Sequence, residues 1–372
     1  MVRKSGWNTV KLKDICDFIG GGTPSRQVEN FWRGNIPWIS SSDLIESSIW
    51  KINITRHITA EAVAKSATHI CPRNTVLVVS RVGVGKVAIA PVEVCTSQDF
   101  TNLVSKKHDA RFLAYCIQTK MKIMAEKTQG TSIKGVTVEN IAQMEIELPP
   151  QEEQTAIAET LSDIDNLISS MQKLIEKKKA IKQGTMQELL TGKKRLPGFY
   201  KEWRIVQIGE TLSIGHGQSQ KTVENRFGKY PILATGGCIG YANDFLWDKP
   251  SVLIGRKGTI DKPQYADYPF WTIDTLFYTK IFDGYDAKFI YYKFCMIDWQ
   301  QYNEASGVPS LNATTIENLQ IIVPEKDEQQ AIAQILSDMD SEIEQLEKKL
   351  AKYQQIKQGM MQELLTGRIR LV

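Results

Sequence analysis

The sequence predicts an α+β protein in which two mixed α/β blocks are separated by two long antiparallel helices that form a coiled coil. The main observation is an internal repeat: residues 153–192 and 328–367, which begin 175 positions apart, are identical at 23 of 40 aligned positions. Both copies carry apolar residues at alternating spacings of four and three, which is typical of a coiled-coil helix. The segments between the copies contain short apolar runs and glycine-rich loops instead. The chain is therefore expected to have a pseudo-twofold internal repeat in which one helix follows each block.

The repeat divides the chain into four segments whose charges differ. The first block is predicted over residues 1–148, the first spacer helix over 149–192, the second block over 193–322, and the second spacer helix over 323–372. The formal net charge of +4 comprises +6 and +2 on the two blocks and −2 on each helical segment. A positive excess on the blocks suits contact with a polyanion, although an ordinary solvated surface of mixed sign explains so small an excess equally well.

Length and composition indicate a soluble protein without a metal site. A chain of 372 residues, 42% of them hydrophobic, can bury two or three separate cores. No apolar run reaches about 18 residues and the first residues lack a signal-peptide core, so we expect a cytoplasmic protein that does not contact a membrane. The six cysteines are scattered and the four histidines show no ligand spacing, which predicts reduced thiols and no bound metal.

Sequence motifs for catalysis are missing. The segment Val82–Lys86 is too short for a phosphate-binding loop of the GxxxxGK[ST] type. The Pro149-Pro150 pair is followed by glutamine, whereas an amino-methyltransferase site needs an aromatic residue there. Neither a GxSxG nor an HExxH motif occurs. The chain is therefore predicted to bind rather than to catalyse.

Both ends of each long helix are marked in the sequence. Each copy follows a proline and acidic residues, which suit the first turn of a helix and the positive end of its dipole. Each copy ends in glycine followed by cations, at Gly192 and Gly367, which suits a helix stop and the negative end. Forty helical residues span about 60 Å. Because the first helix leads into the second block and the second leads out of it, packing of their apolar stripes predicts an antiparallel pair.

The first helix has a weaker apolar stripe than the second. Its stripe is interrupted by polar residues, namely Lys178, Lys182 and Thr185. We expect Ile181 and Met186 to complete the stripe there, with the lysine ammonium groups extending to solvent.

The two blocks share a common plan. Short β-branched runs at 76–79 and 252–254 predict strands, and residues 110–127 and 286–300 are predicted as helices. Several positions correspond between the blocks: Trp7 with Trp203, residues 76–83 with 251–258, Arg81 with Arg256, Gly83 with Gly258, and Asp99 with Asp274. The two arginines are expected to contact a phosphate or a guanine base, or alternatively to pair with Asp99 and Asp274.

Glycine-rich and hydroxyl-rich loops are the candidate nucleic-acid contacts. Such loops let the backbone approach a phosphate, and their side chains can reach base edges. A tight turn is the favoured explanation for any single loop, whereas several such loops in each of two related blocks favour a binding surface. The candidate residues are Thr23, Ser25, Arg26, Ser41, Ser42, Arg81, Lys86, Gln129, Ser132 and Lys134 in the first block, and Gln218, Lys221, Thr235, Gly236, Arg256, Lys257, Ser310 and Asn312 in the second.

These features together resemble the specificity (S, HsdS) subunit of type I restriction-modification enzymes. The resemblance rests on the L-P-P-x-x-E-Q opening at residues 148–154, the QELLTG ending of each repeat, the duplicated layout, and the segment 36–44. It implies that the blocks are target recognition domains, each recognising one half of a split, asymmetric double-stranded DNA target. It also implies that the helices set the gap between the halves. Two adenine-N6 methyltransferase subunits and two motor-nuclease subunits are the implied partners, and S-adenosylmethionine, ATP and Mg²⁺ would belong to them.

Identical polar residues in the two helices are candidate docking positions for two identical partners. They are Asp163, Lys182, Gln183, Gln187 and Glu188 in the first helix, and Asp338, Lys357, Gln358, Gln362 and Glu363 in the second. A solvated helix face is the alternative explanation for them. Gly184 and Gly359 also occupy the same position in both copies, which indicates close helix approach, partner contact or a tolerated kink. An unrecognised methyltransferase and a purely structural scaffold are the competing functions, and the sequence does not specify the DNA bases.

Overall fold

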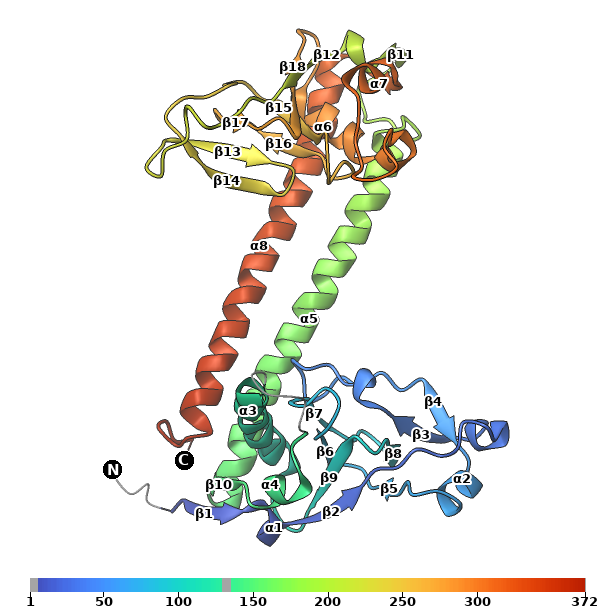
Figure 1. Cartoon of the computed structure of the whole chain (residues 1–372), viewed down its shortest axis with the longest axis vertical. Helices are drawn as coiled ribbons and strands as arrows, with labels where there is room; N and C mark the ends of the chain where they lie inside the picture. The colour runs from blue at the N-terminus through green and yellow to red at the C-terminus, as the bar shows by residue number, and fades with distance from the viewer. Residues whose placement is uncertain (1–5, 129–134, 372) are drawn as a thin grey trace. The chain divides into compact units, whose positions relative to one another are not determined.

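The structure is a computed structural model that describes residues 6–128 and 135–371, so the candidates Gln129, Ser132 and Lys134 lie outside the described residues. The chain forms two compact units. Unit 1 contains Met1–Gln172 and Lys349–Val372, and unit 2 contains Lys173–Lys348. Each unit combines a mixed α/β block with one end of each of two long helices, which confirms the predicted fold class (Figure 1).

Unit 1 contains two four-stranded sheets and a short two-stranded one. The first has the antiparallel order β2 (Cys16–Gly20), β9 (Phe100–Ser105), β6 (Val76–Val79) and β7 (Val87–Ile89). The second has the order β4 (Arg56–Ile58), β3 (Ile36–Ile39), β8 (Val94–Thr96) and β5 (Ile70–Cys71), in which β3 and β8 are parallel. The third pairs β1 (Asn8–Lys11) with β10 (Glu145–Leu148). The helices of the block in unit 1 are α1 (Leu12–Ile15), α2 (Ala60–Ala64), α3 (Ala110–Thr128) and α4 (Val138–Ala142), and its 3-10 turns are η1 (Glu29–Trp32) and η2 (Ser41–Asp43).

Unit 2 repeats this plan with fewer strands. One sheet has the order β12 (Leu212–His216), β18 (Leu276–Ile281), β15 (Ser251–Gly255) and β16 (Gln264–Ala266). Another has the order β14 (Gly237–Ala242), β13 (Tyr230–Ala234) and β17 (Trp271–Thr272), in which β13 and β17 are parallel like β3 and β8. A short sheet pairs β11 (Arg204–Gln207) with β19 (Gln320–Val323). The helices of the block in unit 2 are α6 (Ala287–Cys295) and α7 (Ala313–Asn318), and its 3-10 turns are η3 (Ile208–Glu210) and η4 (Trp299–Tyr302).

The helix predicted over residues 286–300 is too long by one turn. Helix α6 ends at Cys295, and η4 follows as a separate turn. The Asp298 carboxylate accepts a hydrogen bond from the Gln300 N–H and so starts this new turn. The buried Trp299 indole donates to the Phe294 carbonyl oxygen at 2.9 Å, which uses one of the acceptors at the end of α6.

Two helices of 39 residues each, α5 (Gln151–Leu189) and α8 (Lys326–Leu364), carry the repeat. Helix α5 begins directly after Pro150, and α8 begins two residues after Pro324. The glycine beyond each end adopts the left-handed conformation, with φ of +73° at Gly192 and +64° at Gly367. Glycine has no Cβ and takes this conformation without strain, so both helices end where the sequence indicates.

The helices are antiparallel inside each unit. In unit 1, Lys357 of α8 pairs with Asp165 of α5 at 2.6 Å, and Arg370 beyond α8 pairs with Glu153 at 2.6 Å. Residue numbers therefore rise along one helix as they fall along the other. Unit 2 repeats the pattern, because Lys182 pairs with Asp340 and Arg195 pairs with Glu328.

The predicted breaks in the α5 stripe are sites of ion pairing. Lys178 lies 2.7 Å from Glu342, and Lys182 contacts Asp340, both on α8 within unit 2. Met186 is buried as predicted. The expectation for Ile181 is wrong, because this side chain is 44% exposed and the ion pairs occupy the seam in its place. In the described part of the chain, no helix is both long and apolar enough to cross a bilayer.

Candidate nucleic-acid interface

A contact between two loops occurs in the same form in both units. In unit 1 the loop after β3 meets the loop between β6 and β7: the Lys86 ammonium donates to the Ser41 carbonyl oxygen at 3.0 Å, and a Cβ built on Gly83 would lie 3.8 Å from Ser41. In unit 2 a Cβ built on Gly258 would lie 3.7 Å from the Thr235 hydroxyl oxygen. Both glycines have positive φ, +86° and +90°. The structure therefore brings Ser41, Lys86 and Thr235 into equivalent loop clusters.

The match between the blocks shifts by one residue at these loops. The Ser80 and Arg81 N–H groups both donate to the Asp99 carbonyl oxygen, at 2.8 and 3.3 Å. In unit 2 the Arg256 and Lys257 N–H groups both donate to the Thr275 carbonyl oxygen, at 2.8 and 3.2 Å. Arg81 thus corresponds to Lys257, and the predicted matches of Arg81 with Arg256 and of Asp99 with Asp274 are wrong.

The side chains of these cations are available to a partner. Arg81 and Lys257 are exposed, and neither forms an ion pair within the described residues. Arg256 is partly buried, and its guanidinium donates to the Asp274 carbonyl oxygen at 3.3 Å rather than to the carboxylate. The alternative that these arginines pair with Asp99 and Asp274 is therefore excluded for the described residues.

A third loop joins the cluster in unit 2. The Gly258 N–H donates to the Pro309 carbonyl oxygen at 2.8 Å, and Ser310 forms a β-bridge with Lys257. Gly236 is exposed beside Thr235. Asn312 has a structural role, because its side chain caps α7 by accepting from the Thr314 N–H at 3.0 Å.

The first glycine-rich loop of each block is a tight turn held to the sheet. A Cβ built on Gly22 would lie 2.3 Å from the Ala67 backbone, and one on Gly217 would lie 1.9 Å from the Ile273 carbonyl oxygen. The Thr23 hydroxyl is bonded to Gln98, and the Gln218 backbone is bonded to β17. Ser25, Arg26, Ser42, Gln218 and Lys221 are exposed at these turns and their neighbours.

Sequence reasoning missed the residues that join these loops in unit 1. The Arg56 guanidinium donates to the Ser40 hydroxyl at 2.6 Å and pairs with the buried carboxylate of Asp43. Its central carbon lies 4.7 Å from the centroid of the Trp38 ring, and the Trp38 indole donates to the Gly22 carbonyl oxygen at 2.9 Å. The sequence carries no local signal for this contact, because the pairing of β3 with β4 is what places Trp38 opposite Arg56.

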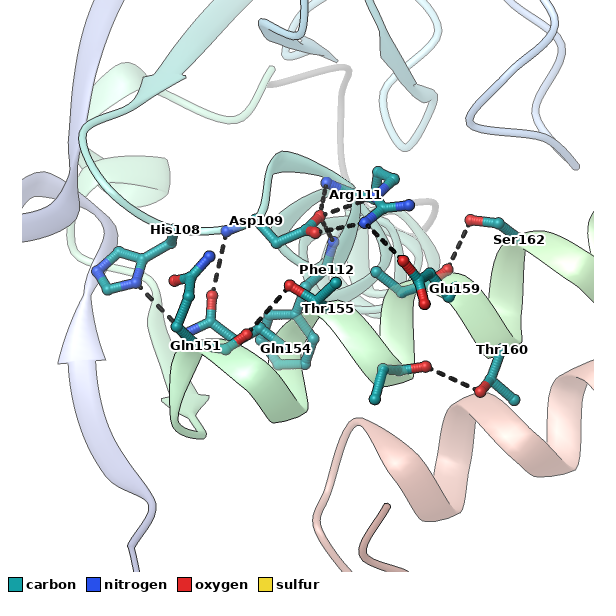
Figure 2. A network of polar contacts seen from close by, with 12 residues as sticks. His108, Asp109, Arg111, Phe112, Gln151, Gln154, Thr155, Glu159, Thr160 and Ser162 are labelled. Carbon is teal, nitrogen blue, oxygen red and sulfur yellow. Dashed lines mark hydrogen bonds and ion pairs between the residues drawn. The ribbon is translucent and has the colours of Figure 1, made fainter. Parts of the chain in front are cut away.

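A buried network fastens each block to the long helices. Gln154, on α5, accepts from the Asp109 N–H at 3.2 Å, as Figure 2 shows, and it also donates to the Pro149 carbonyl oxygen at 2.8 Å. Arg111 next to it pairs with Asp109 at 2.7 Å and approaches Glu159 at 3.9 Å. In unit 2, Gln329 makes the same two bonds, to the Asp286 N–H and the Pro324 carbonyl oxygen, at 2.9 Å each.

A second buried contact ties the start of each block to a long helix. Glu153 accepts from the Trp7 indole at 3.1 Å and is held by two bonds from Arg370, at 2.6 and 2.8 Å. Burial alone would raise the pKa of Glu153, but the hydrogen bonds from Arg370 and Trp7 outweigh it and hold the pKa below its usual value. Trp203, Glu328 and Arg195 repeat this contact, which confirms the match of Trp7 with Trp203.

The lysines proposed as docking residues belong to the seam. Asp165 accepts from the Tyr115 hydroxyl at 2.7 Å and pairs with Lys357, and Asp340 likewise accepts from Tyr292 at 2.7 Å and pairs with Lys182. Burial, together with the adjacent carboxylate, raises the pKa of both tyrosines. The docking prediction for Lys182 and Lys357 is therefore corrected, because their ammonium groups are occupied inside the chain.

The other docking candidates remain at the surface. Exposed residues are Asp163, Gln183, Gln187, Glu188, Asp338, Gln358 and Gln362, and Glu363 is partly buried. Glu188 lies 3.8 Å from Lys194, and Glu363 lies 3.2 Å from Arg368. A Cβ built on Gly184 or Gly359 would meet nothing within 4 Å, so close helix approach inside a unit does not explain these glycines.

Lys293, on α6, is a buried cation beside the C-terminal end of α5. Its ammonium donates to the Leu190 carbonyl oxygen at 3.0 Å, and burial lowers its pKa to about 8. The corresponding residue in unit 1 is Cys116, whose pKa burial raises to about 12. Unit 2 therefore buries an ammonium where unit 1 buries a thiol.

We expect Lys293→Met to raise the stability of the chain at pH 7 by about 2 kcal/mol, the cost of burying the ammonium less one hydrogen bond. Below pH 8 both the folded and the unfolded states hold the proton, so the folded wild type bears the full cost. As the pH rises from about 8 to about 10.5 the folded state loses its proton first, and the advantage of the variant should shrink. Urea unfolding at several pH values measures this difference, and a constant advantage across the range would contradict it.

A metal centre is not among the features found, since in the described ranges no three His, Cys, Asp or Glu residues gather to hold an ion. Loop clusters and helix contacts that recur in both units place the chain in the class of duplicated binding proteins. The family model for the type I restriction modification DNA specificity domain matches residues 4–180 and 200–358. The chain therefore belongs to the family of type I restriction-modification specificity subunits, and it carries two copies of the family's domain.

Individual relatives match most or nearly all of the chain. The type I restriction enzyme MjaIX specificity subunit of Methanocaldococcus jannaschii is 25% identical over 98% of this chain and 94% of that protein. The EcoprrI specificity subunit of Escherichia coli is 22% identical over 89% of this chain and 86% of its own length. The crystal structure of the S subunit of a type I restriction-modification system from M. genitalium has the same fold, with a TM-score of 0.69 at 16% identity over 98% of this chain and 97% of that one.

Proposed function

We propose that this chain is the non-catalytic DNA-recognition subunit of a type I restriction-modification complex, and that each block recognises one half of a bipartite, asymmetric DNA target. The observation that carries the proposal is the repeated loop cluster. Ser41 and Gly83 in one unit correspond to Thr235 and Gly258 in the other, and Lys86 adds a bond to Ser41 in unit 1. The same backbone thus presents different side chains, as a protein that recognises two different half-sites requires.

The two long helices are proposed to set the gap between the half-sites and to dock two methyltransferase subunits. The exposed candidates include the pairs Gln183/Gln358 and Gln187/Gln362, which are identical and lie at equal positions on α5 and α8. Two equal surfaces suit two copies of one partner. The open space at Gly184 and Gly359 supports the same assignment, because a glycine on an exposed helix face lets a partner's backbone come close. Motor-nuclease subunits are proposed to join for cleavage.

S-adenosylmethionine, ATP and Mg²⁺ are assigned to the partner subunits in this proposal. The chain itself supplies loops, cations and a helical frame. Incubation of the isolated chain with labelled S-adenosylmethionine and DNA is expected to transfer no methyl group. Transfer by the chain alone would contradict the non-catalytic assignment and favour a self-contained methyltransferase.

The proposal is tested by identifying the target and then changing one block. Methylome sequencing of cells that express the chain with its methyltransferase should give a split sequence, and footprinting should show two protected stretches. Exchange of residues 193–322 for the corresponding block of a relative should change one half of the target and leave the other half as it was. A change in both halves, or protection of one continuous stretch, would contradict recognition by separate blocks.

A further inference from the structure

A shallow pocket of about 430 Å³ lies in unit 1 at the edge of the loop cluster. It is lined by Arg26, Glu29, Trp32, Arg33 and Arg56. The lining residues carry three guanidinium groups and one carboxylate, a sum of +2 that becomes +1 once Asp43, the ion-pair partner of Arg56, is included. The residues come from the glycine-rich loop before η1, from η1 and the residue after it, and from β4. Guanidinium groups gathered beside an indole are suited to a phosphate group.

The aromatic wall of the pocket is held in place by the fold. The Trp32 indole donates to the Ser25 carbonyl oxygen at 3.2 Å, and its ring meets Trp38 edge-on with centroids 5.1 Å apart. The Arg56 guanidinium lies over the Trp38 ring and is held by its ion pair with Asp43. The pocket is therefore preorganised on one side.

The cations on the other side are free to bind. The pair between Arg33 and Glu29 is at the surface, with 71% and 81% of the two side chains exposed, so it contributes little stability and exchanges readily. Arg26 is exposed and has no ion-pair partner among the residues that the structure describes. Both guanidiniums can turn towards an incoming anion without breaking the fold.

The turn that presents Arg33 is built into the strand pairing. A Cβ built on Gly34 would lie 2.0 Å from the Ile58 carbonyl oxygen, so only glycine fits and the turn is fixed against β4. Unit 2 has the same turn, because a Cβ on Gly228 would lie 2.5 Å from the Ala242 carbonyl oxygen. The residue before that glycine is Phe227, which is 90% exposed. The cationic side chain at this position is thus particular to unit 1.

The pocket is continuous with the proposed DNA surface. Arg56 bonds Ser40 and Asp43, and the same loop receives the Lys86 bond at Ser41. We propose that the pocket binds a backbone phosphate of duplex DNA and so fixes the register of the first block on its half-site. This inference rests on the proposed function and adds a defined anchor to it. A phosphate contact positions a protein on DNA but carries no base preference.

The test uses the double variant Arg26→Ala/Arg33→Ala in the full chain, assembled with its methyltransferase subunit. The dissociation constant is measured at several KCl concentrations on a duplex that contains the target identified by methylome sequencing and on an unrelated duplex. We expect about a tenfold weaker affinity on both duplexes and a salt slope that is lower by about 0.9, the value for one lost phosphate contact. Arg73→Ala, an exposed arginine at another turn of unit 1, is the matched control and should change neither quantity.

The outcomes separate this inference from the function on which it rests. An unchanged affinity and slope in the double variant, with target preference intact in the wild type, would overturn the pocket and leave the proposed function standing. Loss of target preference at an unchanged slope would show a base contact and overturn the phosphate assignment. If inorganic phosphate raises the melting temperature of the wild type but not of the variant while DNA affinity is unaffected, the site binds a free anion and the DNA assignment is wrong. A wild-type complex without target preference would contradict the proposed function itself.

Discussion

Replacement of Lys357 by alanine is expected to lower the free energy of unfolding of unit 1 by about 3–5 kcal/mol. Its ammonium lies 2.6 Å from the Asp165 carboxylate, and the two side chains are only 11% and 8% exposed. Asp165 also accepts the Tyr115 hydroxyl, but that neutral donor does not replace a lost countercharge. The variant would leave a carboxylate buried without its partner, which costs more than the pair itself contributes. Urea and thermal unfolding of the full chain measure the loss.

Lys182→Ala is the matched control because the repeat places the same pair in unit 2. Its partner Asp340 is 41% exposed, so water can hydrate the carboxylate once the lysine is gone. We expect a loss of about 1 kcal/mol there, as for a pair near the surface. The double variant Asp165→Leu/Lys357→Met should recover most of the stability lost in Lys357→Ala, since no buried charge remains. Equal losses in the two alanine variants would show that burial is not the cause.

Local signals explain why the long helices could be predicted from sequence. The prolines before Gln151 and Lys326, the glycines at 192 and 367, and the three-four spacing of apolar residues all act within a few positions of the chain. The direction of packing followed from connectivity alone. The comparison of the two blocks also matched Trp7 with Trp203, and both indoles donate to corresponding glutamates of the long helices, Glu153 and Glu328.

Contacts between distant segments explain what could not be predicted. Lys357 appeared as a surface candidate because its partner Asp165 is 192 positions away and carries no local mark. Arg81 was matched to Arg256 because both precede a glycine at the same spacing, whereas the backbone hydrogen bonds match it to Lys257. The pocket around Arg33 and Arg56 forms only when β3 pairs with β4, so no single stretch of sequence contains it.

Removal of seven residues from both long helices is expected to shorten the gap in the DNA target while both half-sites stay the same. Deletion of residues 170–176 from α5 and 345–351 from α8 takes out one heptad of each, so the three-four pattern continues across the joins. Seven helical residues span about 10 Å, which equals about three base pairs of duplex. On the proposed function, the methylated sequence should keep its two halves and lose about three positions between them. Methylome sequencing of cells that express the shortened chain measures the gap directly.

The deletion keeps the buried contacts that hold each block to its helices, but it removes Gln172, which accepts a hydrogen bond from Lys51 of the first block at 2.8 Å. The removed heptads do not include the hydrogen bonds of Gln154 with Asp109 in unit 1 or of Gln329 with Asp286 in unit 2. Both blocks therefore keep their attachment to the long helices. A melting temperature close to that of the wild type would show that the shortened chain still folds. A folded variant that methylates the original sequence with its original gap would refute the spacer role of the helices. A variant that methylates altered half-sites would instead show that the helices help to recognise bases, because the blocks themselves are unchanged.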